Sequence, residues 1–298
     1  GRSPVHSDWQ GDRNVLSAMA DADVVLVNGE GTIHSDRPAA RRLVSVADHC
    51  ASIGKPAVLL NASWFSNGAE LVEMARRFAI VSVRESESER QLGDAGLTCR
   101  RMADLALHEE IEASGSRSGM GVTDSVLAEN ALQLDLFRRR HEAEMINLFY
   151  GHDGIAGMRF FLRLYGARQA LGDPVRLARA VRAALASYRS QVLTDDGILA
   201  LIGRLELLLT GRFHAAIFAL ASLTPLLAVE SNTPKISATL KDAGVAPWRV
   251  RQDADFDDEL LRKARRWTGD EAANIRDFLS DNRARQTQLF KDIAALAA

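Results

Sequence analysis

Short apolar runs alternate with amphipathic stretches through the first third of the chain, and this order constrains the fold more than any other feature. Between residues 21 and 107, strands are predicted at DVVLVNG, KPAVLLNAS, AIVSVRES and CRRMADLAL, with helices over residues 37–54, 67–78 and 86–97 between them. Strands that alternate with helices form parallel sheets with right-handed crossovers. The first run, residues 24–27, is continuously apolar, as in a strand that is covered on both faces.

A second set of elements follows residues 109–119, where apolar side chains are few and serine and glycine frequent, so we place a linker there. Strands are predicted at GMGVTDSV, MINLFYG, residues 207–210 and PLLAVES, and helices over residues 127–145, 157–191, 212–223, 235–245 and 255–298. The predicted fold class is α/β, with two Rossmann-like parallel-sheet domains over residues 1–110 and 111–254. Residues 255–298 are expected to form helices that pack back across the domains. The chain opens at Gly1, which leaves open that the first domain lacks its N-terminal strand or strands.

Charge and apolar content narrow the classes of function. The formal net charge of −2 gives no general attraction to nucleic acid. Residues 157–191 are rich in arginine, which invites a nucleic-acid interpretation. We expect acidic residues to alternate with these arginines, and the segment is therefore interpreted as a solvated helical face. No apolar run reaches membrane-spanning length and no signal peptide is recognisable, so we expect a cytoplasmic protein. Cys50 and Cys99 have no metal-ligand spacing and are expected to be reduced and buried.

Polar residues follow each predicted strand of the first domain. Asn28-Gly29-Glu30-Gly31-Thr32 interrupts the apolar pattern of the first strand. Asn61 and Ser63 end the second strand, Arg84 and Glu85 follow the third, and Asp104 follows the fourth. Because ligands of open α/β sheets bind at the carboxyl ends of the strands, these side chains are expected at one edge. Each residue also has a plainer interpretation, since strand-end arginines often pair with carboxylates and a loop aspartate commonly accepts hydrogen bonds from nearby amides.

A second group of candidates lies in the run TGRFHA and in the run ESNTPK. Arg212 and His214 fall in the first turn of a predicted helix, where free amides and the helix dipole favour an anion. Lys235 begins the next helix and could meet the same anion, while Asn232 or Thr233 could cap that helix. The alternative is that His214 is a core histidine and that Arg212 and Lys235 are surface residues.

Taken in order, these segments resemble the polysaccharide pyruvyl transferase superfamily. The matching pieces are DVVLVNGEGTIHSD, SVRESES, ADLAL, GRFHAAIFALASLTPLLAVESNTPKI and LKDAGV, spread over about residues 20–245. The resemblance implies a GT-B-like enzyme, in which two Rossmann-like domains face a cleft. It also implies transfer of pyruvate from phosphoenolpyruvate to a saccharide as a ketal, usually on a cell-surface glycan such as capsule or lipopolysaccharide.

The resemblance also implies roles for single residues. Arg84, Arg212 and Lys235 would bind the carboxylate and phosphate of the donor, and His214 would donate a proton. The other donor-binding candidates are Asn28, Gly29, Gly31, Thr32, His34, Ser231 and Asn232. For His34, a cap on the following helix is slightly favoured over a part in the chemistry.

Transfer of the keto sugar Kdo is an alternative reaction. A retaining GT-B-like glycosyltransferase that uses CMP-Kdo needs a carboxylate nucleophile and a second acid/base group, and Asp104 and Glu30 could fill these roles. A third hypothesis is a non-catalytic member that binds glycan or scaffolds an assembly complex.

We place pyruvyl transfer first. No cofactor and no metal is expected beyond the donor, which is phosphoenolpyruvate or CMP-Kdo. The expected partners are this small-molecule donor and a saccharide acceptor, with no nucleic acid. Association with the inner face of the cell membrane through a lipid-linked glycan is a further expectation.

Overall fold

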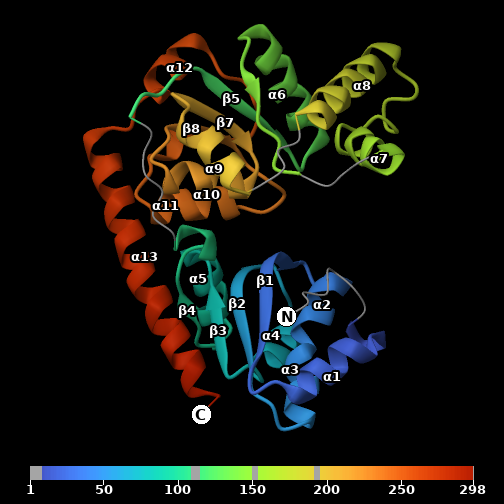
Figure 1. Ribbon diagram of the computed structural model, residues 1–298, viewed down its shortest axis with the longest axis vertical. Coiled ribbons are helices and arrows are strands. Elements are labelled where there is room, and N and C mark those ends of the chain that lie inside the picture. Colours follow the sequence, from blue (N-terminus) through green and yellow to red (C-terminus); the bar gives the residue numbers. More distant parts are fainter. Residues whose placement is uncertain (1–8, 109–114, 150–153, 191–194, 298) are drawn as a thin grey trace. The chain divides into compact units, whose positions relative to one another are not determined.

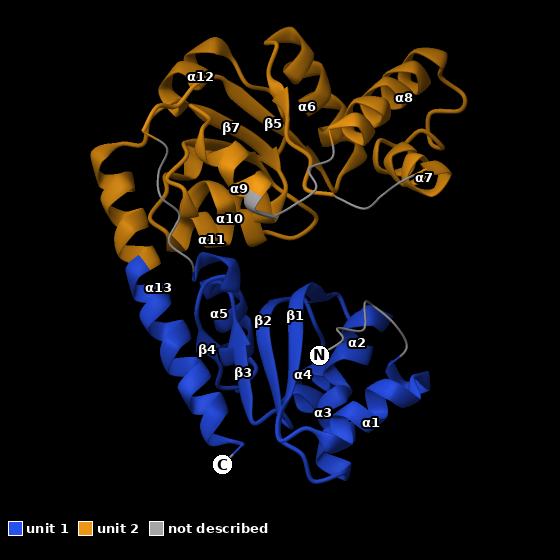
Figure 2. Cartoon of the chain, viewed as in Figure 1, with its two compact units in different colours: residues 1–108, 280–298 blue, residues 109–279 orange. Residues whose placement is uncertain are grey.

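The computed structural model describes residues 9–108, 115–149, 154–190 and 195–297, which form two compact units. Unit 1 comprises residues 1–108 and 280–298, and unit 2 comprises residues 109–279 (Figure 2). Each unit contains a parallel sheet with helices, so the prediction of two Rossmann-like α/β domains is confirmed. Residues 109–114 of the expected linker lie outside the described residues.

Unit 1 is built on a four-stranded parallel sheet in the order β1-β2-β3-β4 (Figure 1). Its elements are η1 (Trp9–Gly11), α1 (Arg13–Asp21), β1 (Val25–His34), α2 (Pro38–Val44), α3 (Val46–Ser52), β2 (Ala57–Phe65), α4 (Ala69–Ala75), β3 (Ile80–Val83), α5 (Ser86–Asp94), β4 (Arg100–Arg101) and η2 (Leu105–Leu107).

Position in the sheet explains which strands of unit 1 are covered. All nine residues of β2 are buried because this strand lies inside the sheet, between β1 and β3. β1 lies at the edge of the sheet, and Leu26 on it is exposed while Val25 and Val27 are buried. The expectation that this run is covered on both faces is therefore wrong, because an edge strand can keep one face open.

Two local features depart from the sequence-based expectation in unit 1. The helix expected over residues 37–54 is two helices, α2 and α3, that meet at Ser45, whose hydroxyl donates to the Arg42 carbonyl oxygen at 3.0 Å. The first strand continues past the glycine-containing run to His34, with an irregular register between Glu30 and Ile33.

Unit 2 is built on a five-stranded parallel sheet in the order β6-β5-β7-β8-β9. Its elements are β5 (Met120–Ser125), α6 (Ala128–Arg140), β6 (Glu144–Met145), α7 (Gly154–Leu164), α8 (Pro174–Arg189), α9 (Asp195–Gly203), β7 (Leu207–Gly211), α10 (Phe213–Ala221), β8 (Leu226–Val229), α11 (Lys235–Asp242), η3 (Pro247–Arg249), β9 (Val250–Arg251) and α12 (Asp258–Ala264). The expected strand MINLFYG is limited to Met145 at the end of β6, and its last two residues lie outside the described part of the chain.

Apolar composition determines the core of unit 2. The helix α10 contains no charged residue after Arg212, and seven of its nine residues are buried. β7 and β8, which flank α10 in the sequence, are buried along their whole lengths. This agrees with the expectation of a buried helix between two buried strands.

The last helix, α13 (Gly269–Ala295), contributes to both units, since its residues from Ser280 onward belong to unit 1. In unit 1, Leu289 and Ile293 pack with Val58, Leu60 and Met102. In the described part of the chain, no helix combines the length and apolar character needed to cross a membrane.

Candidate active site

The end of β1 brings Glu30 to the edge of the unit 1 sheet through an unusual backbone. Glu30 has a φ of 46°, in the left-handed region that side chains other than glycine rarely adopt. The preceding Gly29 allows β1 to approach β2, because a Cβ at this position would lie 2.6 Å from the Cβ of Ala62. The side chain of Glu30 is 36% exposed, so its carboxylate is partly open to solvent.

Arg84, immediately after β3, holds two carboxylates of the same edge. Its side chain is 1% exposed, and its Nη1 donates to Asp104 Oδ2 at 2.7 Å and to Glu30 Oε2 at 3.1 Å. A buried guanidinium needs such partners because an unpaired buried charge is costly. The three residues, which we call the carboxylate cluster, place one positive charge between two carboxylates. A cation bound there would have to compete with the charge that Arg84 already supplies.

Two further side chains, Asn61 and Ser63, donate or accept hydrogen bonds with the carboxylate cluster. Asn61, in β2, donates from Nδ2 to Glu30 Oε1 at 3.1 Å and accepts from the backbone N–H of Leu105 at 3.2 Å. Asn61 also has a positive φ of 53°. Ser63 Oγ accepts from Arg84 Nε at 3.2 Å and from Nη2 at 2.8 Å. The same hydroxyl donates to Glu85 at 3.1 Å, which leaves each arm of the Arg84 guanidinium with a partner.

Asp104 lies beyond the two-residue β4, as the N-cap of η2. It is 2% exposed, and its Oδ1 accepts from the Ala106 N–H at 3.0 Å while Oδ2 accepts from Arg84. Helix α13 supports this loop, because Gln286 Nε2 donates to the Asp104 carbonyl oxygen at 3.0 Å. Both carboxylate oxygens of Asp104 are therefore engaged in hydrogen bonds.

The remaining sequence-predicted residues of unit 1 lie along β1. Asn28 is exposed and donates from Nδ2 to Glu30 Oε1 at 3.0 Å, so it belongs beside the carboxylate cluster. Gly31 and Thr32 follow in the irregular part of the strand. His34 is buried, with Nδ1 3.3 Å from Ser35 Oγ. The N-cap residue of α2 is Arg37, so the expected capping role of His34 is not what the structure shows.

In unit 2, Arg212 stands between β7 and α10 as the N-cap residue of the helix. Its Nε and Nη2 donate to the two oxygens of Asp124 at 2.5 and 2.8 Å, and its guanidinium lies 4.7 Å from the centre of the Phe149 ring. Among the residues that the structure describes, no acceptor binds Nη1 of Arg212. The side chain is 14% exposed, so Arg212 combines a fixed orientation with unused donors.

Close approach of β5 and β7 fixes the Asp124–Arg212 pair. Gly211 ends β7, and a Cβ there would lie 2.4 Å from the Cβ of Ser125. The hydroxyls of Thr123 and Thr210 are 2.8 Å apart, and Thr210 Oγ1 accepts from the Arg212 N–H at 2.9 Å. The ends of β5 and β7 are therefore in close contact and joined by hydrogen bonds beside Arg212.

Tyr165 is a buried side chain close enough to Asp124 and Arg212 to be affected by their charges. Burial raises its pKa far above the usual range, and the charge of Asp124 acts in the same direction. Its hydroxyl lies 2.6 Å from Ser187 Oγ. Tyr165 is therefore protonated at neutral pH and contributes no charge.

His214 and Lys235 both lie near the ring of Phe213. The His214 ring is 5.5 Å from the Phe213 ring, and the Lys235 ammonium group is 5.9 Å from the same ring centre. Both side chains are half-buried. Unit 2 thus gathers three of the predicted donor-binding or catalytic residues around the first turn of α10.

Ser231 and Asn232 belong to the turn before α11. Ser231 Oγ donates to the Thr233 carbonyl oxygen at 2.9 Å, and Asn232 is exposed. The start of α11 is held by Glu230, which accepts from the N–H groups of Ser231 and Ser237 at 2.9 and 3.0 Å. The N-cap residue is Pro234, so neither Asn232 nor Thr233 fills the capping position considered for it.

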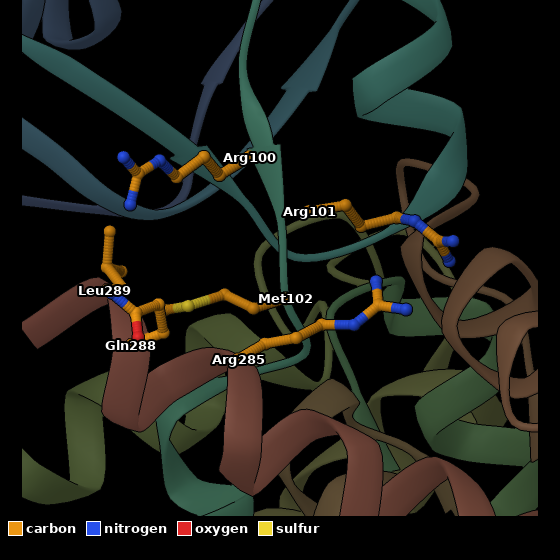
Figure 3. A pocket seen from close by; sticks show the side chains of 6 residues that line it. All are labelled: Arg100, Arg101, Met102, Arg285, Gln288 and Leu289. Carbon is orange, nitrogen blue, oxygen red and sulfur yellow. The ribbon is translucent and has the colours of Figure 1, made fainter.

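A hollow of about 200 Å³ in unit 1 lies between β4 and α13. It is lined by Arg100, Arg101, Met102, Arg285, Gln288 and Leu289 (Figure 3). Figure 3 shows Arg100 pointing away from Arg101 and Arg285. Arg100 pairs with Asp292 and Arg101 with Glu89, so these arginines already have carboxylate partners. None of the sequence-predicted site residues lines this hollow.

Asp124 was missed as a candidate site residue, whereas Asn61 and Ser63 were expected at the same sheet edge as Glu30 but were given no role. Asn61 and Ser63 lie in the second half of β2, which continues to Phe65, and polar side chains after an apolar run were the only available signal. Asp124 is the next-to-last residue of β5 and also follows an apolar residue pattern. Their importance comes from pairing across strands, with Glu30, Arg84 and Arg212 respectively, and a single sequence carries no sign of such pairs.

Comparison with known proteins identifies one family. The family model described as polysaccharide pyruvyl transferase matches residues 2–233, which include every strand of unit 1 and the Arg212 turn of unit 2. No curated protein matches the chain.

Proposed function

The chain belongs to the polysaccharide pyruvyl transferase family and is therefore a transferase that acts on polysaccharide; from this premise we propose that it transfers pyruvyl from phosphoenolpyruvate to a saccharide as a ketal. The suspected superfamily is thus confirmed, whereas donor and acceptor are part of the proposal.

The hydrogen bonding of Arg212 is the observation that supports this proposal. Asp124 fixes two of its nitrogens, and Nη1 is left for a ligand in the part of the chain that the structure describes. Phosphoenolpyruvate carries a carboxylate and a phosphate on one carbon, and a guanidinium matches either group. Lys235, beside Phe213, would supply a second positive charge. Together these residues suit a compact donor with two anionic groups.

The proposed chemistry needs one acid and one base. His214 protonates C3 of the donor, and C2 develops positive charge that an acceptor hydroxyl captures. Glu30 is proposed to take a proton from an acceptor hydroxyl. The C2–O bond to phosphate breaks and a second hydroxyl closes the ketal. The proton of that second hydroxyl restores the proton that His214 gave to C3, and the proton taken by Glu30 passes to the released phosphate. Arg212 and Lys235 stabilise the leaving phosphate.

The burial of Asp104 argues against the CMP-Kdo alternative. A nucleophile must present a free oxygen to the anomeric carbon, and both oxygens of Asp104 accept hydrogen bonds in a side chain that is 2% exposed. We therefore propose that Asp104 holds Arg84, and through it Glu30. Under this proposal Arg84 positions the two carboxylates rather than binding the donor.

The function is tested by incubating the protein with phosphoenolpyruvate or CMP-Kdo and a panel of saccharides. Acceptor-dependent phosphate release, with a ketal-linked pyruvyl group on the product by mass spectrometry, is expected. Release of CMP alone would overturn the proposal in favour of glycosyl transfer. Failure to bind either donor would favour a non-catalytic glycan-binding or scaffold protein.

The role of Arg212 is tested by Arg212→Gln. Loss of a charge-assisted contact is expected to raise the KM for phosphoenolpyruvate by about 10- to 100-fold. Arg138→Gln is the matched control, because Arg138 also donates from Nε and Nη2 to a buried carboxylate, that of Asp135. An equal rise in KM in both variants would mean that Arg212 acts only on the fold.

A further inference from the structure

The hairpin formed by α7 and α8, residues 154–190, has a charge unlike that of the rest of the chain. It contains seven arginines, Arg159, Arg163, Arg168, Arg176, Arg179, Arg182 and Arg189, and a single acidic residue, Asp173. Its net charge is +6, whereas the whole chain carries −2. The expectation that acidic residues alternate with the arginines is therefore wrong for this segment.

Among the described residues, a single carboxylate outside the hairpin pairs with one of these arginines. Arg176 pairs with Glu129 at 2.8 Å, and the other six arginines make no ion pair with any residue that the structure describes. Asp173 is engaged as the N-cap of α8, where it accepts from the N–H groups of Val175 and Arg176. The positive charge of the hairpin is therefore exposed on the surface of unit 2, where a negatively charged partner could contact it.

Apolar side chains stand among these arginines on the surface. Ile155, Leu171 and Val175 are 75%, 72% and 60% exposed, and Val181 and Leu185 are exposed to a smaller degree. Ile155, Leu171 and Val175 are the three most exposed large apolar side chains of the described residues.

The pattern along α8 explains this surface. One side of the helix is buried through Ala180, Ala183, Ala184 and Ser187. At 100° per residue, Val175, Val181 and Leu185 fall on the opposite side, with Arg179, Arg182 and Arg189 interleaved. The outer face of α8 is thus both apolar and basic. Figure 1 shows α7 and α8 beside α6, at one side of unit 2.

From this combination we propose that the α7–α8 hairpin docks the protein on an anionic lipid surface. Arginines attract the negative headgroups, and apolar side chains enter the boundary between headgroups and acyl chains. A solvated helical face would not expose five large apolar side chains. A nucleic-acid surface would use the arginines but would leave Ile155, Leu171 and Val175 without a partner.

The test measures binding of the full chain to vesicles by co-sedimentation. Vesicles of phosphatidylcholine are compared with vesicles of equal parts phosphatidylcholine and phosphatidylglycerol, at low and high salt. Binding is expected only to the anionic vesicles and is expected to weaken with salt. The combined variant Arg179→Gln, Arg182→Gln and Arg189→Gln should bind about a hundredfold more weakly, at about fivefold per arginine.

A second variant separates the apolar contribution. Val181→Ser with Leu185→Ser keeps the charge and should also weaken vesicle binding, whereas binding to a duplex RNA should not change. The control is Arg13→Gln, Arg37→Gln and Arg42→Gln, three exposed arginines of unit 1 with the same loss of charge, which should bind as the wild type does.

Three results would overturn the proposal. One is equal binding to neutral and anionic vesicles, and another is an equal loss in the control variant. The third is tight RNA binding that the arginine variant loses while vesicle binding persists. Circular dichroism of each variant verifies that the hairpin is folded.

Discussion

Arg84 shows how one buried residue can organise several functional groups. Its guanidinium reaches Glu30, Asp104 and Ser63 from a position that is almost inaccessible to solvent. Removal of one partner of a buried ion pair commonly costs about 3–5 kcal/mol, because the remaining charge is left uncompensated. Substitutions of Arg84 would therefore confound activity with stability, and a neighbour gives a cleaner test.

Asn61 is that neighbour. Its φ of 53° suits glycine, so Asn61→Gly should relieve backbone strain while removing the hydrogen bonds that Asn61 makes to Glu30 and to the Leu105 N–H. We expect the free energy of unfolding to stay within about 1 kcal/mol of the wild type and the transferase rate to fall about tenfold. Urea unfolding and initial rates measure the two quantities.

The companion variant Asn61→Ala loses the same hydrogen bonds and keeps the strained backbone. It should match Asn61→Gly in rate but be less stable by about 1 kcal/mol. If Asn61→Gly kept full activity, the hydrogen bond to Glu30 would have no part in catalysis.

At the scale of elements, the order of strands and helices could be predicted because it follows from apolar periodicity. The run that forms α10 and β8 was unambiguous, since only buried elements are so apolar. The break between α2 and α3 at Ser45 could not be predicted, because no glycine or proline marks it in the sequence. The left-handed backbone of Glu30 was also missed, because residues other than glycine rarely adopt it.

The candidate site was predictable in part. Strand-end positions drew attention to Glu30, Arg84 and Asp104, and the structure joins these three by hydrogen bonds. Asp124 was overlooked because its partner, Arg212, lies 88 residues further along the chain. Contacts between distant strands depend on register, and no local pattern encodes them.

The contact between β5 and β7 gives a prediction at this scale. Gly211→Ala would place a Cβ 2.4 Å from that of Ser125, so the two strands must separate. We expect a loss of about 1–3 kcal/mol in stability and a weaker affinity for the donor, because Arg212 follows directly. Thermal unfolding and donor titration measure these effects.

Gly203→Ala is the control for this substitution. Gly203 ends α9, and a Cβ there would lie 3.7 Å from the Cβ of Ser222, an ordinary contact. This variant should be as stable as the wild type or slightly more stable. Equal destabilisation by both substitutions would refute a special role for the β5–β7 contact.

At the scale of the whole molecule, the acid stability of the chain should depend on Glu271 near the start of α13. Burial alone would raise the pKa of Glu271, but hydrogen bonds from Arg249, Thr268 and Ala246 and the charge of Arg249 lower it from 4.5 to about 2. A lowered pKa in the folded state stabilises the protein above pH 4.5, and this contribution is lost as the pH falls towards 2. The contribution at neutral pH is about 3 kcal/mol.

Glu271→Gln is expected to remove this part of the pH dependence. Urea unfolding followed from neutral pH downwards should show a steeper loss of stability in the wild type than in the variant. Asp292→Asn serves as the control, because Asp292 also has a lowered pKa through Arg100 but lies at the surface, where solvent screens the pair. Identical acid unfolding of Glu271→Gln and the wild type would contradict the assignment.

The division of α13 between the two units has a consequence for biosynthesis. Residues 1–108 leave the ribosome first, yet Leu289 and Ile293, which close one part of their core, are made only after all of unit 2. At ordinary rates of translation this delay is about 10–30 seconds. During that interval we expect the nascent first unit to expose Val58, Leu60 and Met102, and this apolar surface is of the kind that chaperones bind.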